Sequence, residues 1–249
     1  MTDSTGAAVG APPPNSPGSA PPGSSRPAPA PPSFEPTART TLRRLADRGS
    51  YDVGLVHSIL DEALICHVGF TVEDRPYVIP TIHARVGNTV YLHGSPASRM
   101  LRTLKGGVDV CVTVTIVDAL VLARSAFHHS LNYRSVVVLG RAHPVADGEE
   151  KRSVLEALVD HIAPGRSGEV RPPSDLELRS TLVLALPLDE VSAKVRTGPS
   201  VDEDADLTLP VWAGLLPLST AAGEAEDDPA LHLAPGSPRP SEVVTGWRR

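Results

Sequence analysis

The sequence predicts a mainly β domain with helices, an α+β fold whose strands form a closed or split antiparallel barrel. Two observations lead to this prediction. Runs of β-branched residues separated by turn residues fill most of residues 63–145 and 181–198. One short amphipathic segment, residues 98–105, interrupts these runs as a helix would. A β-sandwich fits the same pattern and stays an alternative.

The predicted domain occupies residues 37–218, because both ends of the chain lack a hydrophobic period. Residues 1–36 are almost all Ala, Pro, Gly and Ser, and they offer too few apolar side chains to offset the entropy of ordering the backbone. Residues 219–249 are rich in Gly, Pro, Asp and Glu. We expect a disordered arm before the domain and a disordered tail after it.

Helices open and interrupt the predicted domain. Apolar side chains recur at helical spacing in residues 40–60, with a break in the middle that predicts two short helices. Ser98 is a favourable N-terminal cap and a Gly-Gly pair follows Lys105, so residues 98–105 are predicted to be helical. An acidic start and one apolar face predict a longer helix over residues 147–163, followed by a shorter one near residues 174–180.

Strands make up the rest of the predicted domain. The first ones form a meander with tight turns, and more strands follow the interrupting helix. The run that begins at Ser135 is continuously apolar, as in a strand buried at the centre of a sheet. The predicted strands are residues 63–72, 77–86, 89–94, 108–117, 119–126, 132–145, 181–188 and 190–198.

Charge and composition exclude several classes of function. The chain has 23 Lys and Arg against 29 Asp and Glu, a net charge of −6, no basic block and only 4% aromatic residues, which argues against a nucleic-acid partner. No apolar run approaches the roughly 18 residues of a spanning helix, and the N-terminal arm lacks the features of a signal peptide. We therefore expect a cytoplasmic protein without a membrane partner.

Known nucleotide and hydrolase motifs are missing from the sequence. It has no P-loop, no Gly-rich dinucleotide fingerprint and no nucleophile elbow. The two cysteines, Cys66 and Cys111, lie in apolar strand-like runs without CxxC spacing. We expect both to be buried free thiols and expect no metal site.

The short helix over residues 98–105 concentrates positive charge. Ser95 and Ser98 would place hydroxyls at its start, beside the unpaired N–H groups of the first turn, and Arg99, Arg102 and Lys105 would add cations along its face. This combination is typical of a phosphate site. The alternative is a solvated basic helix face.

Several histidines can face one cavity. His67, His83 and His93 lie on successive predicted strands, and His128 and His129 precede a later one. Their spacing lacks the regularity of a zinc site. An axial ligand of a haem iron needs only one imidazole, which the spacing does not exclude. Each of these side chains can instead be a satisfied core or surface residue.

Charged and polar residues also enter apolar strands. Tyr133 and Arg134 lead into the predicted central strand, and Arg196 lies in the last one. Burying such a charge costs free energy unless it meets an anion or a carboxylate. Either these side chains bind a ligand, or they pair with carboxylates at the barrel rim. The candidate carboxylates are Asp118, Asp189 and Glu190.

The order of these motifs resembles the nitroimidazole-reductase-like branch of the pyridoxamine 5′-phosphate oxidase superfamily. The resemblance covers about residues 36–218 and rests on the stretches RPYVIPTIHARVGNTVYLHGSPASRMLRTLK, FHHSLNYRSVVVLGRAHPV and SAKVRTGP. It implies an FMN-binding split β-barrel of about six or seven antiparallel strands. It also implies a homodimer, with the flavin ring lying across the barrel seam.

The resemblance further implies site residues. His93 would be the catalytic group, as a proton donor or an electrostatic partner of the flavin. The phosphate would lie at the interrupting helix and the ring against the second strand of the meander, with further contacts from the last strands. The implied cofactor-binding residues are Val78, Pro80, Thr81, Ser98, Arg99, Lys105, Tyr133, Arg134 and Arg196.

On this resemblance we expect an FMN-dependent oxidoreductase that passes electrons, with NAD(P)H as the source, to a small planar acceptor such as a nitro-aromatic. Vitamin B6 oxidation is disfavoured, because the C-terminal Arg-Leu-His pattern of true pyridoxamine phosphate oxidases is missing. Some split-barrel relatives hold haem, so one alternative is a haem b-dependent reductase or oxygenase with His93, His128 or His129 as axial ligand. Another is a non-catalytic flavin-nucleotide-binding protein.

Overall fold

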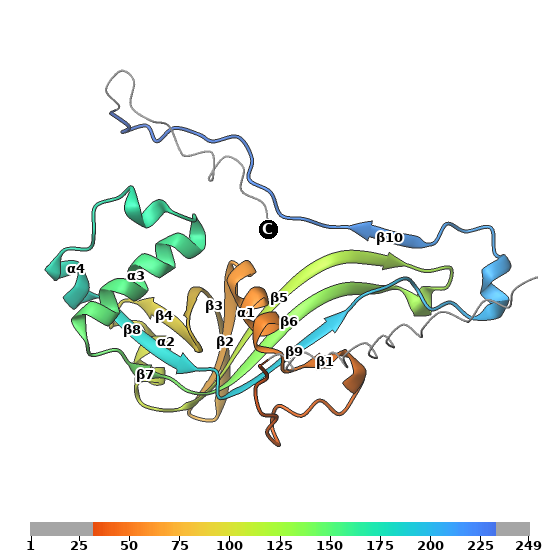
Figure 1. Ribbon diagram of the computed structural model, residues 1–249, viewed down its shortest axis with the longest axis horizontal. Helices are drawn as coiled ribbons and strands as arrows, with labels where there is room; N and C mark the ends of the chain where they lie inside the picture. The colour runs from red at the N-terminus through yellow and green to blue at the C-terminus, as the bar shows by residue number, and fades with distance from the viewer. Residues whose placement is uncertain (1–31, 233–249) are drawn as a thin grey trace, which may run out of the picture. The chain divides into compact units, whose positions relative to one another are not determined.

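The computed structural model describes residues 32–232 (Figure 1). The α-helices of this part are α1 (Val53–Glu62), α2 (Arg99–Lys105), α3 (Gly148–Ile162) and α4 (Asp175–Ser180). The strands are β1 (Gly49–Ser50), β2 (Ile65–Val72), β3 (Arg75–Val86), β4 (Thr89–Gly94), β5 (Asp109–Leu122), β6 (Ser130–Arg141), β7 (His143–Pro144), β8 (Leu182–Pro187), β9 (Glu190–Arg196) and β10 (Gly214–Pro217).

The strands form an antiparallel sheet in the order β1-β9-β6-β5-β2-β3-β4-β8-β7, with β10 on β5. The sheet divides at β3, which pairs with β2 through residues 75–82 and with β4 through residues 83–86. The first part of β3 thus belongs to the half of the sheet that contains β2, and its last part belongs to the half that contains β4. The fold is a split β-barrel of the α+β class, as the sequence predicts.

Tight turns hold the β2-β3-β4 meander together. Glu73 and Asp74 join β2 to β3 with φ angles of 49° and 60°, and Gly87 (φ 57°) lies in the turn from β3 to β4. Left-handed residues of this kind match the twist of antiparallel strands in short hairpins. The turns fix the register that places His67 opposite Pro80.

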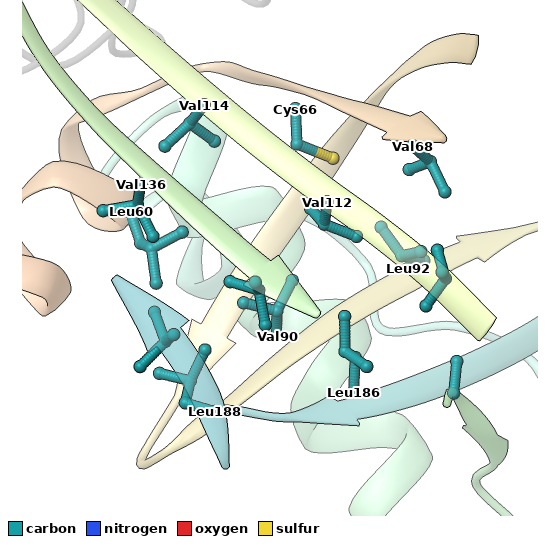
Figure 2. Close-up of a cluster of buried hydrophobic side chains, with 14 of the residues drawn as sticks. Leu60, Cys66, Val68, Val90, Leu92, Val112, Val114, Val136, Leu186 and Leu188 are labelled. Atoms are coloured by element: carbon teal, nitrogen blue, oxygen red, sulfur yellow. The ribbon is translucent and has the colours of Figure 1, made fainter. Parts of the chain in front are cut away.

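The core lies inside the barrel, and α1 closes one side of it. Asp52 caps α1 by accepting a hydrogen bond from the Leu55 N–H (2.7 Å), and Val56 and Ile59 are fully buried. The core side chains drawn in Figure 2 include Leu60, Cys66, Val68, Val90, Leu92, Val112, Val114, Val136, Leu186 and Leu188. A second, smaller apolar cluster joins α3 to the outer side of β4 and β8.

Alternation along β2 separates core from surface. Cys66 and Val68 are buried, whereas His67 between them is exposed. Cys66 is thus a buried free thiol, as predicted. Cys111 is a free thiol as well but is only half-buried, because it lies on the outward-facing register of β5.

Several elements differ from the sequence prediction. β5 is one strand of 14 residues where two were predicted, and an irregularity between Val117 and Ala119 absorbs the break. Of the two helices predicted within residues 40–60, α1 forms, but the first is only a 3-10 turn at Ala46–Arg48. β10, which the sequence did not predict, pairs with the free edge of β5 and runs beside it in Figure 1.

The predicted arm and tail fall mostly outside the described residues, which exclude 1–31 and 233–249. Within the described part of the arm, Ser33 forms a bridge with Asp52, and Phe34 packs against the core cluster. Residues 219–232 of the tail are exposed. No helix among residues 32–232 is long and apolar enough to cross a membrane.

Candidate functional site

The positive charge predicted on α2 is present and available. Arg99, Arg102 and Lys105 are exposed, and none of them forms an ion pair within residues 32–232. Arg99 lies over the ring of Tyr77 on β3, with its guanidinium carbon 5.3 Å from the ring centroid. Ser98 is the N-cap residue of α2, and its side chain makes no capping hydrogen bond. These side chains can therefore bind an anion.

The strand beside α2 is uncovered on both faces. Val78 is 63% exposed and Ile79 is 39% exposed, although neighbouring residues of a strand point to opposite sides. Pro80 is also exposed and Thr81 is half-buried. Among the strands of residues 32–232, β2 alone pairs with residues 75–82, so this part of β3 offers apolar surface along the barrel seam. Such a surface suits a planar ring or another chain.

His93 lies at the end of β4, one turn of chain before α2. Burial lowers the pKa of its imidazole, and its Nδ1 atom is buried without a hydrogen-bond partner among the described residues. Gly94 follows with φ 153°, and a side chain there would meet Leu101 at 3.1 Å. The absent side chain at position 94 therefore lets the chain turn tightly from His93 into the basic helix.

A cavity of about 810 Å³ opens on the other side of β2. The end of α1, the start of β2, the middle of β5 and the segment after β10 surround it. Fewer than half of the residues that line it are aliphatic, and the others are polar or charged, including His67, Asp118 and Arg134. The residues that line it are Glu62, Ala63, Leu64, Ile65, His67, Thr115, Ile116, Val117, Asp118, Arg134, Leu218, Ser219 and Thr220.

Arg134 sits between two carboxylates at this cavity. It forms a bidentate pair with Glu62, with Nη2 2.7 Å from Oε1, and it also binds Asp118, with Nη2 2.7 Å from Oδ1. Hydrogen bonds to Glu62 and then to Asp118 raise the pKa of the guanidinium, so it stays protonated. The ion-pairing alternative considered for Arg134 is therefore the one observed, and its donors point to the protein's own carboxylates.

Arg196 also forms hydrogen bonds with neighbouring residues. It is buried, and it donates to the Asn132 side chain and to the carbonyl oxygens of Gly198 (3.3 Å) and Pro199 (3.2 Å). These bonds hold the turn that follows β9. Tyr133 lies directly opposite Arg196 in the β6-β9 ladder. The structure thus joins Tyr133 and Arg196 to each other and does not join them to α2.

His128 and His129 lie away from α2 and from the cavity. They belong to the turn between β5 and β6, around the 3-10 segment Ala126–His128. Nε2 of His128 is 3.6 Å from Glu203, and Nδ1 of His129 is 2.9 Å from the Ser125 carbonyl oxygen. Neither lines the cavity.

Sequence reasoning missed Glu62 at the cavity and did not distinguish His67 from the other strand histidines. Glu62 ends α1, where the negative end of the helix dipole disfavours a carboxylate, and this was a signal that a cation lies nearby. His67 was one of three strand histidines, and its exposed register became evident only from the pairing of β2. No group of three or more His, Cys, Asp or Glu side chains within residues 32–232 is arranged to hold a metal ion.

The chain is similar in sequence and structure to several known proteins. The family model described as pyridoxamine 5′-phosphate oxidase matches residues 52–195. The flavocytochrome Anf3 from Azotobacter vinelandii shares 37% identity with a TM-score of 0.77, covering 86% of this chain and 99% of that protein. The FAD and haem binding protein from Mycobacterium smegmatis shares 35% identity with a TM-score of 0.75, covering 80% and 98%.

A more distant solved structure is a putative 5-nitroimidazole antibiotic resistance protein from Bacteroides thetaiotaomicron. It shares 28% identity with a TM-score of 0.50, covering 59% of this chain and 86% of that protein. Among curated proteins, none has a sequence that matches this chain. The nitroimidazole-reductase-like branch is therefore less similar to this chain than the two haem-related structures are.

Proposed function

Because the chain belongs to the pyridoxamine 5′-phosphate oxidase family, we propose that it is a redox protein that binds both a flavin and a haem. One observation carries this proposal: a flavocytochrome and a protein named for binding FAD and haem are each more than 30% identical to this chain, and both match over most of it. Haem, which the sequence left as an alternative cofactor, is therefore part of the function proposed here.

The flavin site of this proposal is the surface formed by α2 and β3. Arg99 and Lys105 carry charges that no described carboxylate neutralises, and they bind the flavin phosphate. Val78, Pro80 and Thr81 offer the flat exposed strand on which the flavin ring lies. Arg134 and Arg196 take no part, because their guanidinium groups are committed to neighbouring residues.

We propose FAD as the flavin. FMN was expected from the family resemblance, but the Mycobacterium smegmatis protein that is 35% identical to this chain is named for binding FAD. The basic residues of α2 are spread over the whole helix, with Arg99 and Lys105 about 9 Å apart along its axis. Their spread provides cations for more than one phosphate group.

The proposed haem is of the non-covalent b type. The sequence holds two cysteines, and they are far apart and not arranged as the CxxCH that attaches a c-type haem. The residues present fit such a group in one respect that the structure itself provides. A cavity of about 810 Å³, lined by both aliphatic and polar side chains, falls in the range of roughly 300–1,000 Å³ seen for cofactor sites.

When bound, a flavin supplies one- and two-electron chemistry and a haem iron supplies one-electron chemistry. The chain's own residues bind these groups and handle protons. Burial lowers the pKa of His93, which favours the neutral imidazole, and its Nδ1 has no partner among the described residues, so the ring can take part in proton transfer. This is the role proposed for His93, and NAD(P)H is the proposed electron source.

Reduction of a small planar nitro-aromatic is the second candidate function. The similarity to a putative 5-nitroimidazole antibiotic resistance protein favours it. The exposed face of β3 can accept such a ring stacked on the flavin. If the protein binds flavin but oxidises no NAD(P)H with any acceptor, it is a binding protein without catalysis.

We further propose that the protein is a homodimer. An apolar strand exposed on both faces, and exposed side chains such as Phe127 (89%) and Trp212 (66%), are costly to leave in water. A second copy of the chain would cover them. Sedimentation of the purified protein tests this, and a monomer at micromolar concentration would contradict it.

The experiment that tests the function separates cofactor from activity. Cofactors are extracted from the full chain and identified by chromatography, and NAD(P)H oxidation is measured with nitro-aromatics, quinones and oxygen. We expect FAD and haem b in similar amounts, with oxidation that depends on the acceptor. FMN alone would refute the cofactor proposal, and no oxidation with any acceptor would refute the redox proposal.

A further inference from the structure

The cavity beside β2 is a gap in the sheet. β6 occupies one edge of β5 along most of its length, so β2 and β10 share the opposite edge. On that edge β2 pairs with residues 110–113 and β10 pairs with residues 119–122. Residues 114–117 between them have no strand partner there among the described residues, and the Asp118 carbonyl oxygen accepts a hydrogen bond from the Leu218 N–H (2.9 Å) just beyond β10. The end of α1 and the segment after β10 enclose this gap as the cavity of about 810 Å³.

His67 is the histidine of this cavity. Five of the nine histidines already have a hydrogen-bond or ion-pair partner, namely His57, His83, His128, His129 and His161. His67 forms no such contact within residues 32–232, and it is exposed. His93 also has a ring nitrogen to offer, but His67 alone among the histidines lines the cavity. An imidazole without a hydrogen-bond partner at a cavity that is partly aliphatic can serve as an axial haem ligand.

The charges around the cavity separate it from the proposed flavin site. Arg134 with Glu62 and Asp118 carries a net charge of −1 at its wall, whereas α2 is wholly basic. An anionic phosphate is repelled by the first region and attracted by the second. Ferric haem carries one positive charge at its iron and ring and two negative charges on its propionates, so only the iron and ring suit the negative wall. Five aliphatic residues from the α1-β2 junction and from β5 complete the enclosure, namely Ala63, Leu64, Ile65, Ile116 and Val117.

We propose that His67 is the axial ligand of a haem that lies in this cavity, between the free end of β2 and the segment after β10. The inference deepens the proposed function and rests on its haem. It replaces His93, His128 and His129, which the sequence offered for the same role. His93 then remains with the flavin, and the two groups have separate imidazoles.

The test compares three variants of the full chain with the wild type. His67→Ala removes the imidazole, His67→Cys replaces it with a thiolate, and His143→Ala changes an exposed histidine on β7 as the matched control. Haem content is measured by the pyridine haemochrome, haem affinity by haemin titration, and ligation by the absorption spectrum of the ferric form. Flavin absorbance and thermal unfolding report whether each variant is folded.

We expect His67→Ala to bind haemin at least about tenfold more weakly, the lower end of the effect of disturbing groups around a metal. Added imidazole should restore binding, and His67→Cys should shift the haem spectrum to that of a thiolate complex. His143→Ala should match the wild type. Unchanged haem affinity and spectrum in His67→Ala would overturn the proposal, as would loss of haem in His93→Ala instead. If the wild type takes up no haemin, the proposed function itself fails in its haem part.

Discussion

The flavin site is tested most sharply by neutralising the basic helix. In the double variant Arg99→Gln, Lys105→Gln, the phosphate loses two cationic partners. A hydrogen bond to a charged group contributes about 1.5–3 kcal/mol, and because both side chains are exposed we take the lower end for each. The loss is then about 3 kcal/mol, which corresponds to roughly 100-fold weaker binding.

In the assay, the flavin-free protein is titrated with FAD, FMN and riboflavin, and binding is measured from the quenching of flavin fluorescence. Riboflavin has no phosphate, so its affinity should be the same in the double variant and the wild type. The control Arg141→Gln removes an exposed arginine of β6 that lies outside α2. FAD affinity that stays within about twofold of the wild type would refute the phosphate site on α2, since each lost contact alone should exceed that change.

Three further predictions concern stability and reactivity. Replacing Arg134 with Met removes the ion pairs with Glu62 and Asp118, whose side chains are about a third exposed, so the free energy of unfolding should fall by about 2 kcal/mol in urea denaturation. An unchanged midpoint would show that these ion pairs contribute nothing. Burial lowers the pKa of His93 below 6.5, so the unfolded chain binds more protons under that pH and stability should decline as pH falls from about 7 to 5. In His93→Gln, stability should decline less between pH 7 and 5 than in the wild type. The same dependence of stability on pH in both proteins would contradict this prediction. Burial raises the pKa of the Cys66 thiol to about 12, so alkylation near pH 8 should modify it only after unfolding, and rapid labelling of the native protein would argue against the packed core.

The fold was largely predictable because its strands carry a clear local signal. Alternation in residues 63–94 and the cap at Asp147 define the meander and α3 without any tertiary information. β10 could not be predicted in this way, since it is short, contains Pro217 and owes its strand geometry to pairing with β5. For β5 itself, the polar Asp118 indicated a break between two strands, yet the ladder with β6 continues past it.

The site was predictable where it depends on local sequence and not where it depends on distant pairing. The cations of α2 follow from one short stretch of the chain. The partner of Arg134, in contrast, is 72 residues away at Glu62, and only the fold brings α1 beside β6. For the same reason His67 could not be distinguished from His83 and His93, because its position depends on where β2 stops pairing with β5.

The central claim is that one chain carries a flavin and a haem at separate places. Anaerobic reductive titration of the purified protein, followed by absorbance, counts the electrons that it takes up. We predict about three electrons per chain, two in the flavin bands and one in the haem bands. Uptake of only two electrons, all of them in the flavin bands after haemin has been supplied, would contradict the account.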